Sequence, residues 1–575
     1  MRTIIVWLAV VCGVWPAAFA QTTLNLSEDL VPLGIASTNM VPNQPSLDAG
    51  PLFFRAVSYA QNHQIGQVIA DRGAYYFRSL QYSGAHVAWD KLSNLTIDLQ
   101  GSDLYFSFPL VTGISITNST NLVVQNFTAD YDPLPFTQVR VVSVDAGQRR
   151  IQFAVDGGWQ NPSVLNALFG IVPNQGVEVH MFRNGRPIAG VPRMYAANPI
   201  GSDQFIIAPD PYAGYSINAV LAQIRAGDIA FLGMRLGSGP VTVLHCTGCT
   251  FRNIVAYSGT YWGLWAAFTQ SSIFERIYSI PRPGTDRLAS NYVGLGSPGV
   301  GPGNQLRLNR MIRTMDNGFE YHAAEFGTVQ SQTDNRTFVL AGSITSQVQY
   351  GNTVPNGSAV AFQKPSDGTI LATAVIVSQV APPGTGQQPR QVTFTFDRDL
   401  PANIVGTVMY GTDPSQRGGN AVIERNAVEE ETDCCHGLFI AGLANSVVRG
   451  NYIERSAMSG LHTENSLQPG NFNSPPAANF TISNNVIDGA NWTPTGYFLS
   501  QLGSIELDET SAVPSVSTFI RSAMSGGGPR EIPFDWVQLP PRHVSRIPTR
   551  MRAPRRSMRL RRSVSASSSP CGKIA

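Results

Sequence analysis

"NAVIERNAV" (420–428), "NSVVRGNYI" (445–453) and "NFTISNNVI" (479–487) are three segments that follow one template. Each has an Asn, two residues, an apolar residue, two residues, a second Asn, one residue and a β-branched residue. Their starts lie 25 and then 34 residues apart. Segments of this length are too short for helices and too apolar for loops, so they predict short strands that recur along the chain.

Looser copies of the template occur upstream, at 94–101, 121–129, 249–257, 272–280 and 304–312. Short strands at such intervals cannot bury their apolar side chains alone, but coils stacked on one another bury a continuous column. Asn suits the corners of such coils, because it tolerates left-handed backbone and forms hydrogen bonds along the stack. The pattern predicts an all-β chain, a right-handed parallel β-helix. A β-sandwich would favour hairpin turns and strict alternation, which are scarce here.

Two regions lack the Asn pattern and contain alternating strands instead, which predicts two β-barrel or sandwich domains inserted between coils. At the start of the body, 47–70 predicts an amphipathic helix followed by a strand, and "DRGAYYF" (71–77) comes next. This start resembles the N-terminal helical cap and first coil of the pectate-lyase-like β-helix superfamily. The expected domains are a signal peptide (1–20), capped N-terminal coils (45–136), a first insertion (137–236), central coils (237–326), a second insertion (327–415), C-terminal coils (416–510) and an irregular region with a basic tail (511–575).

The first twenty residues have the features of a secretory signal. Arg2 precedes the apolar run "IIVWLAVVCGVW", and the small residues "AFA" (18–20) fit a cleavage site. The run is too short to span a bilayer comfortably, and no other segment is long and apolar enough, so no stable membrane insertion is expected. The sequence therefore predicts a secreted protein, extracellular or periplasmic.

The net charge of +2 conceals two parts of opposite sign. Nine arginines and no acidic residue lie between Arg542 and Arg562, and Lys573 brings this tail to +10, so the rest of the chain sums to 2 − 10 = −8. The tail composition is typical of a disordered segment. Without aromatic residues or a recognition motif beside these charges, no nucleic-acid partner is expected.

After removal of the signal, five cysteines remain: Cys246, Cys249, Cys434, Cys435 and Cys571. In an oxidising compartment the two close pairs are candidates for disulfides. "HCTGC" (245–249) is also half of a metal-site pattern, but no second half follows at zinc spacing, so we expect neither a metal nor a cofactor.

"TMDNGFEYHA" (314–323) places two carboxylates, an amide and an imidazole within seven positions. Glycoside hydrolysis normally needs two carboxyl groups, about 5 Å apart for retention and about 6.5–9.5 Å for inversion. Asp316 is the first candidate. An extended strand would put Asp316, Glu320 and His322 on one face, with the two acids about 13 Å apart. The second carboxyl is therefore Glu320 after a turn at Gly318, or it comes from another coil, from Asp286 before or from the run "EEETD" (429–433) after.

The order of several segments resembles glycoside hydrolase family 110, exo-acting α-galactosidases that pair a β-helix with inserted β-barrels. The matching segments are 126–141, 249–266, 276–290, 311–323 and 418–431. The resemblance implies a glycan or polysaccharide substrate and a catalytic Asp pair at the position of Asp316 and Asn317. Two departures are visible: the second acid of the pair is Asn317, and "SNYVGLGSPGVGPGN" (290–304) holds no carboxylate.

The predicted catalytic residues are Asp316, Glu320 and Asp286. The predicted sugar contacts are Asn317, Tyr321, His322, Asp132, Trp262, Trp265 and Arg287. Flat aromatic rings stack on the C–H faces of sugars, and opposite strand parity lets only one of the two tryptophans face a ligand. Two alternatives remain open. A polysaccharide lyase would use Tyr321 or His322 as base beside Arg282, Arg287, Arg310 and Arg313, and a non-catalytic protein would bind glycans or serve as a structural β-helix.

Overall fold

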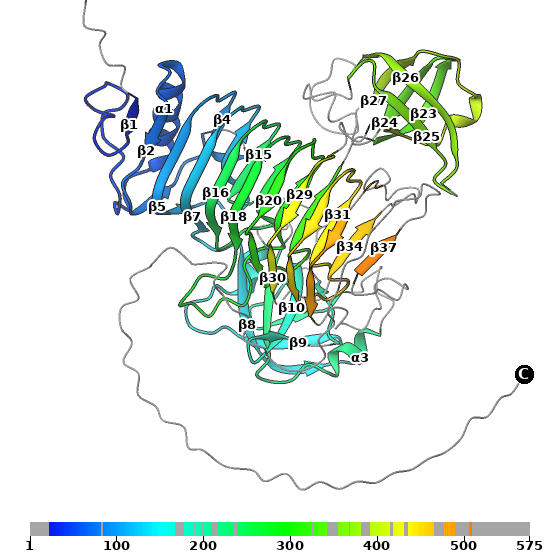
Figure 1. Cartoon of the computed structure of the whole chain (residues 1–575). Coiled ribbons are helices and arrows are strands. Elements are labelled where there is room, and N and C mark those ends of the chain that lie inside the picture. Colours follow the sequence, from blue (N-terminus) through cyan, green and yellow to red (C-terminus); the bar gives the residue numbers. More distant parts are fainter. Residues whose placement is uncertain are drawn as a thin grey trace, which may run out of the picture. The chain divides into compact units, whose positions relative to one another are not determined.

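The computed structural model describes residues 22–81, 84–166, 177–188, 190–197, 199–208, 216–234, 239–323, 326–341, 355–366, 368–380, 391–413, 418–429, 435–464, 477, 479, 481–488 and 505–508. Most of these residues belong to a right-handed parallel β-helix, as the repeated template predicted (Figure 1). Two long sheets of parallel strands form its walls, and the chain passes from one sheet to the other in each coil.

The first sheet has fifteen strands. They are β1 (Thr23–Asn25), β2 (Gln67–Ile69), β3 (Ala74–Phe77), β5 (Thr96–Phe106), β7 (Val123–Tyr131), β16 (Thr250–Ala256), β18 (Ile273–Ser279), β20 (Gln305–Arg307), β21 (Arg310–Ile312), β29 (Val422–Glu424), β30 (Ala427–Glu429), β32 (Val447–Arg449), β33 (Tyr452–Glu454), β35 (Thr481–Ser483) and β36 (Val486–Asp488). The second sheet has nine: β4 (Ala85–Asp90), β6 (Thr112–Thr117), β15 (Val241–Leu244), β17 (Trp262–Ala267), β19 (Val293–Pro298), β22 (Phe319–His322), β31 (Leu438–Ala441), β34 (Leu461–Glu464) and β37 (Ile505–Asp508).

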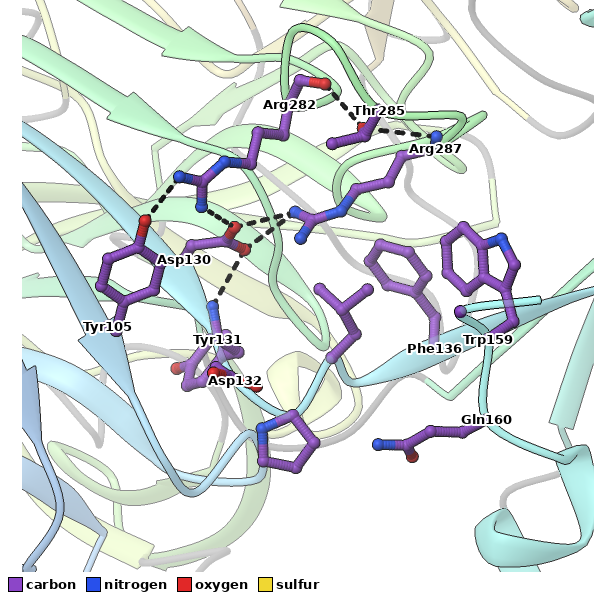
Figure 2. A pocket seen from close by; sticks show the side chains of 13 residues that line it. Tyr105, Asp130, Tyr131, Asp132, Phe136, Trp159, Gln160, Arg282, Thr285 and Arg287 are labelled. Carbon is purple, nitrogen blue, oxygen red and sulfur yellow. Dashed lines mark hydrogen bonds and ion pairs between the residues drawn. The ribbon is translucent and has the colours of Figure 1, made fainter. Parts of the chain in front are cut away.

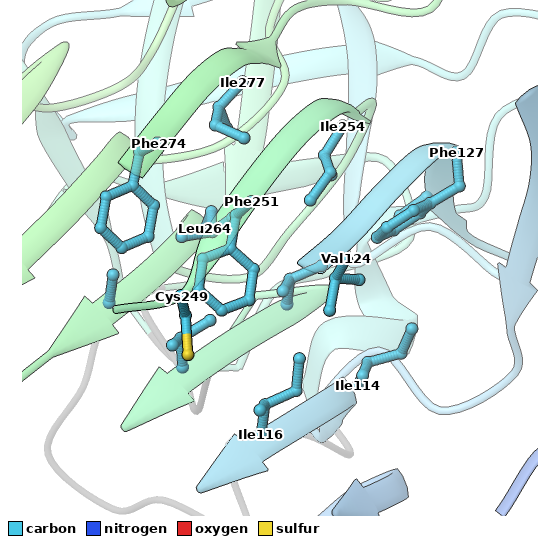
Figure 3. Close-up of a cluster of buried hydrophobic side chains, with 14 of the residues drawn as sticks. Ile114, Ile116, Val124, Phe127, Cys249, Phe251, Ile254, Leu264, Phe274 and Ile277 are labelled. Carbon is cyan, nitrogen blue, oxygen red and sulfur yellow. The ribbon is translucent and has the colours of Figure 1, made fainter. Parts of the chain in front are cut away.

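The three template segments pair in register across neighbouring coils. Ile423 lies beside Val448, and Val448 lies beside Ile482, so the apolar position of the template forms one buried row. Similar rows fill the whole interior; Figure 3 shows Val124, Phe251 and Phe274 from three consecutive coils facing inward together. The repeated pattern in sequence thus becomes a continuous apolar core.

Asparagines occupy the corners for two different reasons. The first Asn of each template segment has a left-handed backbone, with φ values of 58° at Asn420 and 50° at both Asn445 and Asn479. The second Asn of each segment is buried and belongs to a ladder of side-chain hydrogen bonds. In that ladder Asn426 donates to Asn451 at 2.9 Å, Asn451 donates to Asn485 at 2.9 Å, and Asn309 donates to Asn426 at 3.0 Å.

Replacing Asn426 with Ala is expected to lower the free energy of unfolding by about 2–4 kcal/mol, because the backbone and side-chain donors of Asn309 lose their acceptor in a buried site. The midpoint of thermal or chemical unfolding measures this effect. Asn218 is exposed on helix α3 (Ile217–Leu221), so Asn218→Ala is the matched control. Equal midpoints for the two variants would contradict the structural role of the ladder.

The N-terminal end of the solenoid carries the predicted helical cap. Helix α1 (Ala49–Asn62) begins at Asp48, whose carboxylate accepts a hydrogen bond from the Gly50 amide, and its apolar face includes Phe53. The Phe53 ring meets Trp89 of β4 edge-on, with the ring centres 4.8 Å apart. The cap therefore covers apolar side chains that the first coils would otherwise expose.

Two further sheets occupy the regions where insertions were expected, and each begins one residue before the predicted bound. The first is a seven-stranded antiparallel sheet of β8 (Phe136–Asp145), β9 (Arg150–Ala154), β10 (Val177–Arg183), β11 (Arg186–Pro187), β12 (Met194–Ala196), β13 (Gln204–Ile206) and β14 (Ile229–Gly233), accompanied by η1 (Pro162–Val164) and α3. The second is a closed barrel of β23 (Phe326–Asp334), β24 (Thr337–Ala341), β25 (Ala359–Gln363), β26 (Ile370–Val380), β27 (Gln391–Phe396) and β28 (Val408–Gly411), with η2 (Ala402–Ile404). Each has an apolar core of its own.

Candidate functional site

A cavity of about 390 Å³ opens where coils of the β-helix meet the first insertion (Figure 2). Its volume lies in the range of small-molecule binding sites. The wall combines charged, phenolic and aromatic side chains from four separate stretches of the chain. The lining residues are Tyr105, Asp130, Tyr131, Asp132, Pro133, Leu134, Phe136, Gly158, Trp159, Gln160, Arg282, Thr285 and Arg287.

Asp130, near the end of β7, is the centre of the charged wall and is only 2% exposed. Its carboxylate accepts hydrogen bonds from Arg282 at 2.9 Å and from Arg287 at 2.9 and 3.0 Å. The hydroxyl of Ser258 donates at 2.5 Å, and the amide of Tyr131 donates at 3.0 Å. With these hydrogen bonds, the Asp130 side chain fixes both arginines in place.

Arg282 lies close to two aromatic rings. Its guanidinium carbon is 5.2 Å from the centre of the Tyr105 ring and 5.5 Å from that of Tyr257, and one of its nitrogens donates to the Tyr105 hydroxyl at 2.5 Å. Burial alone lowers the pKa of Arg282, but the hydrogen bonds to Tyr105 and Asp130 outweigh burial and raise the pKa above its ordinary value. Arg282 is therefore a fixed positive charge in the wall.

Hydrogen bonds join the loop after β18 to the first insertion and complete the pocket. The side chain of Gln138 donates to the carbonyl of Asp286 at 3.1 Å and accepts from the Leu288 amide at 2.7 Å. The Trp159 indole donates to the carboxylate of Asp286 at 2.9 Å, and the ring of Phe136 lies 6.2 Å from that of Trp159. These hydrogen bonds therefore fix the arginine-bearing loop and the aromatic side chain Trp159 relative to one another.

The structure brings three predicted residues to this cavity. Asp132 and Arg287 line it, and Asp286 binds the lining residue Trp159. Asp132 is exposed, and in the described part of the chain its carboxylate has no hydrogen-bond partner. Two lining residues, Asp130 and Arg282, were absent from the predicted set of sugar contacts, although both lie in segments that carry the family resemblance.

Asp316 and Asn317 do not line the cavity. They form a corner before β22, where the Asp316 amide donates to the Tyr292 carbonyl at 2.7 Å and the Asp316 carboxylate accepts from the Asn317 amide at 2.8 Å. Asn317 in turn accepts from the amide of His436 in the next coil at 2.9 Å. A Cβ at Gly318 would lie 2.5 Å from Val428, so the corner packs tightly against the core. Asp316 is 6% exposed in this arrangement.

Strand β22 begins at Phe319, which corrects the expectation of one extended strand through Asp316. Glu320 and His322 share the outer face of the solenoid, and their side chains lie 3.2 Å apart. Tyr321 points into the core and is 0% exposed, so its prediction as a sugar contact or as a base is wrong, because the strand turns it away from solvent.

The two tryptophans of β17 lie near that outer face rather than at the cavity. The rings of Trp262 and Trp265 stack with their centres 5.7 Å apart, although their strand parity is opposite. Trp262 achieves this by covering Gly296 of the next coil, where a Cβ would come 1.9 Å from its ring. The parity argument fails here because the neighbouring glycine leaves room for an indole.

Histidines on the same side of the solenoid predict a pH-dependent stability. His436 and His462 stack with ring centres 4.1 Å apart, and burial, together with the charge of His462, lowers the pKa of His436 well below its ordinary value. Burial also lowers the pKa of His245 to about 4. The unfolded chain, with imidazole pKa values of about 6.5, therefore binds more protons than the folded chain between these values, so stability falls as the pH drops below about 6.5.

Thermal midpoints measured between pH 7.5 and 5 are expected to fall steadily, and His436→Gln is expected to flatten this slope whatever its effect on the midpoint at pH 7.5. An unchanged slope in the variant would contradict the assignment of this proton uptake to His436.

Cys246 and Cys249 are buried free thiols, so the expected disulfide between them is wrong. Both are core residues, and their sulfurs donate to backbone carbonyls of the same and the neighbouring coil at 3.5–4.0 Å. The hydrogen bond between the two thiols, with burial, raises the pKa of Cys246. Cys435 is disulfide-bonded, whereas Cys434 and Cys571 lie outside the described residues.

Within the described ranges, no group of three or more His, Cys, Asp or Glu side chains is arranged to hold a metal ion. Among the same residues, no helix has the length and apolar character needed to cross a membrane. The signal segment 1–20 and the basic tail lie outside these ranges.

No protein-family model matches the chain, and no curated protein matches its sequence. Similar solved structures include the A-module of the mannuronan C-5 epimerase AlgE4 from Azotobacter vinelandii, with 11% identity, 84% of this chain and 94% of that chain covered, and a TM-score of 0.30. A mutant tailspike protein of E. coli bacteriophage HK620, in complex with a pentasaccharide, has 8% identity, coverages of 88% and 62%, and a TM-score of 0.37.

The endo-xylogalacturonan hydrolase from Aspergillus tubingensis has 8% identity to this chain, coverages of 84% and 98%, and a TM-score of 0.34. At these identities the likeness to all three proteins concerns the fold alone.

Proposed function

We propose that this chain is a secreted carbohydrate-active enzyme, a glycoside hydrolase that holds one sugar unit of a glycan in the cavity between the β-helix and the first insertion. The observation that carries the proposal is the convergence of Asp132, Arg287 and Trp159 on one cavity, from three separate parts of the sequence. Aromatic surface, fixed charges and an available carboxylate are the components that sugar chemistry requires.

The aromatic side of the cavity supplies sugar stacking. Trp159 and Phe136 line it, and Trp159 is held by its hydrogen bond to Asp286, so its ring keeps one orientation when a sugar arrives. An oriented ring loses little freedom on binding, which favours affinity. The other lining side chains provide hydroxyl, amide and guanidinium donors that can form hydrogen bonds with the sugar hydroxyls.

Among the acids at the cavity, Asp132 is assigned the proton-transfer role. The oxygens of Asp130 already accept hydrogen bonds from both arginines and from Ser258, so they are engaged within the wall rather than directed at a substrate. Asp132 lines the cavity without such partners among the described residues. Asp286, at the edge of the site, is the second carboxyl group that hydrolysis needs. This assignment keeps the reaction class that the resemblance to family 110 implies, but moves the chemistry away from Asp316.

The proposal is tested by a depolymerisation screen of neutral and acidic glycans that measures new reducing ends. Wild-type protein is expected to release reducing ends from at least one glycan. Trp159→Ala is expected to raise KM about tenfold or more, in keeping with the loss of one stacked aromatic contact, and Trp159→Phe to restore most of that loss. Glycan retention without any products would instead identify a binding protein.

Elimination is the second candidate reaction, because Arg282 donates a hydrogen bond to the Tyr105 hydroxyl at the cavity wall. In that reaction the Tyr105 oxygen is the base that removes the proton next to a sugar carboxylate. A lyase of this kind releases unsaturated products that absorb in the ultraviolet, which the same screen detects. Products without that absorbance would leave hydrolysis as the reaction.

A further inference from the structure

Two arginines of the cavity wall share one buried acid, while the second lining acid, Asp132, is exposed and makes no hydrogen bond to them among the described residues. Arg282 and Arg287 both contact Asp130, so two guanidinium groups share one carboxylate. Their side chains are 25% and 12% exposed, whereas Asp130 is 2% exposed. All three side chains line the cavity, and Asp130 is the most deeply buried of them (Figure 2). A fixed, partly desolvated positive charge of this kind favours an anion in the cavity.

Arg287 also has unused donors. One of its terminal nitrogens, Nη1, makes both hydrogen bonds to Asp130. Its other terminal nitrogen, Nη2, and its Nε have no partner among the residues that the structure describes. Nε–H and Nη2–H form the side edge of a guanidinium, and that edge matches the two oxygens of a carboxylate in a bidentate pair.

We infer that the sugar unit bound in this cavity is a uronic acid, whose carboxylate pairs with the free edge of Arg287. The inference rests on the proposed function and names its substrate class. Asp130 binds Arg287 through Nη1 alone. The acid therefore positions the arginine and leaves its Nε–H and Nη2–H groups available for a ligand carboxylate. Arg282 adds positive charge from its place near the rings of Tyr105 and Tyr257, and the ring of the sugar lies against Trp159.

A structural brace is the competing role for the arginines, since they also tie the loop that carries them to β7. The two roles separate when stability and ligand preference are measured on the same variants. Arg183 provides the matched control: in the first insertion it makes a bidentate ion pair with the buried Asp228, at 2.7 and 2.8 Å, away from the cavity.

The full chain is titrated with acidic oligosaccharides built from glucuronate, galacturonate, mannuronate or guluronate. Each acidic oligosaccharide is compared with its carboxyl-reduced neutral form, and the dissociation constant is measured for both. Sulfated neutral oligosaccharides and their desulfated forms make a separate arm. Wild type is expected to bind at least one acidic member about tenfold or more tightly than its reduced partner, because a charge-assisted bidentate pair is lost on reduction. Arg287→Gln is expected to abolish that preference, and Arg287→Lys to restore only part of it.

Arg183→Gln is expected to keep the full preference even where it lowers the thermal midpoint. Equal binding of acidic and reduced partners, lost in Trp159→Ala, would overturn the uronic acid inference and leave the proposed function standing. Discrimination confined to the sulfated pairs would overturn it in favour of a sulfate ester. Retention of no glycan at all would overturn the inference together with the proposed function.

Discussion

Asp132→Asn is expected to lower kcat on the glycan substrate by about 10²–10⁴-fold, the range that a positioned general acid or base contributes. The amide keeps the size and polarity of the side chain, but it exchanges one acceptor oxygen for an NH2 donor and cannot transfer the proton. Because Asp132 is exposed and has no hydrogen-bond partner among the described residues, the folded structure does not depend on its charge. The thermal midpoint and KM are therefore expected to change little while kcat falls.

Two further variants make this prediction specific. Asp203 is an exposed acid of the first insertion that does not line the cavity, and Asp203→Asn is expected to keep wild-type kcat. Asp316→Asn tests the position that the sequence had favoured, and its kcat is also expected to stay within about threefold of wild type, since a residue away from the reacting atoms carries no transition-state interaction. Loss of activity in Asp316→Asn together with full activity in Asp132→Asn would return the catalytic role to the corner before β22.

The fold was predictable because its information is local and repeated. Asn420, Asn445 and Asn479 have left-handed backbone at the corners of the coils. Asn tolerates that backbone, so each segment by itself indicates a corner. The buried ladder through Asn426 and Asn451 adds a second signal at a constant offset. Repetition turns weak local preferences into a strong prediction, since each coil must present the same positions to its neighbours.

The cavity was harder to predict because its partners are distant in sequence. Asp130 meets Arg282 across 152 residues and Arg287 across 157, and the whole first insertion lies between them. Coil spacing alone does not tell which loop will reach which strand end across such an insertion. A usable signal existed nonetheless: acids flank the entry to the insertion in "DYDPLPF", and arginines follow its exit in "RPGTDR".

The dense polar stretch around Asp316 shows how composition can mislead. Its residues have two structural roles that the sequence does not distinguish. Asp316 and Asn317 accept hydrogen bonds from backbone amides at a corner, whereas Glu320 and His322 contact each other on the outer face. Polar side chains are common at coil corners because each turn leaves backbone amides without strand partners, and these side chains accept their hydrogen bonds. A polar cluster at a coil corner therefore predicts a turn at least as strongly as it predicts catalysis.

Asp130→Asn is expected to lower the free energy of unfolding by about 2–4 kcal/mol. Removing one member of a buried ion pair costs about 3–5 kcal/mol because the partner charge remains without compensation. The lower range applies here because Arg282 and Arg287 retain some contact with water. The midpoint of chemical unfolding measures the loss, and uronic acid binding is expected to weaken with it, since Arg287 is no longer held.

The double variant Asp130→Asn with Arg287→Gln decides whether the loss comes from this charge. If an uncompensated guanidinium is the cause, the second substitution removes it, and the double variant is more stable than the sum of the two single losses predicts. Asp228→Asn is the matched control, because Asp228 is 4% exposed and pairs with Arg183 in the first insertion. It is expected to lower stability comparably while leaving glycan affinity intact. Additive losses in the double variant would instead mean that Asp130 acts through its hydrogen bonds to Ser258 and the Tyr131 amide, and that the arginines keep their positions without it.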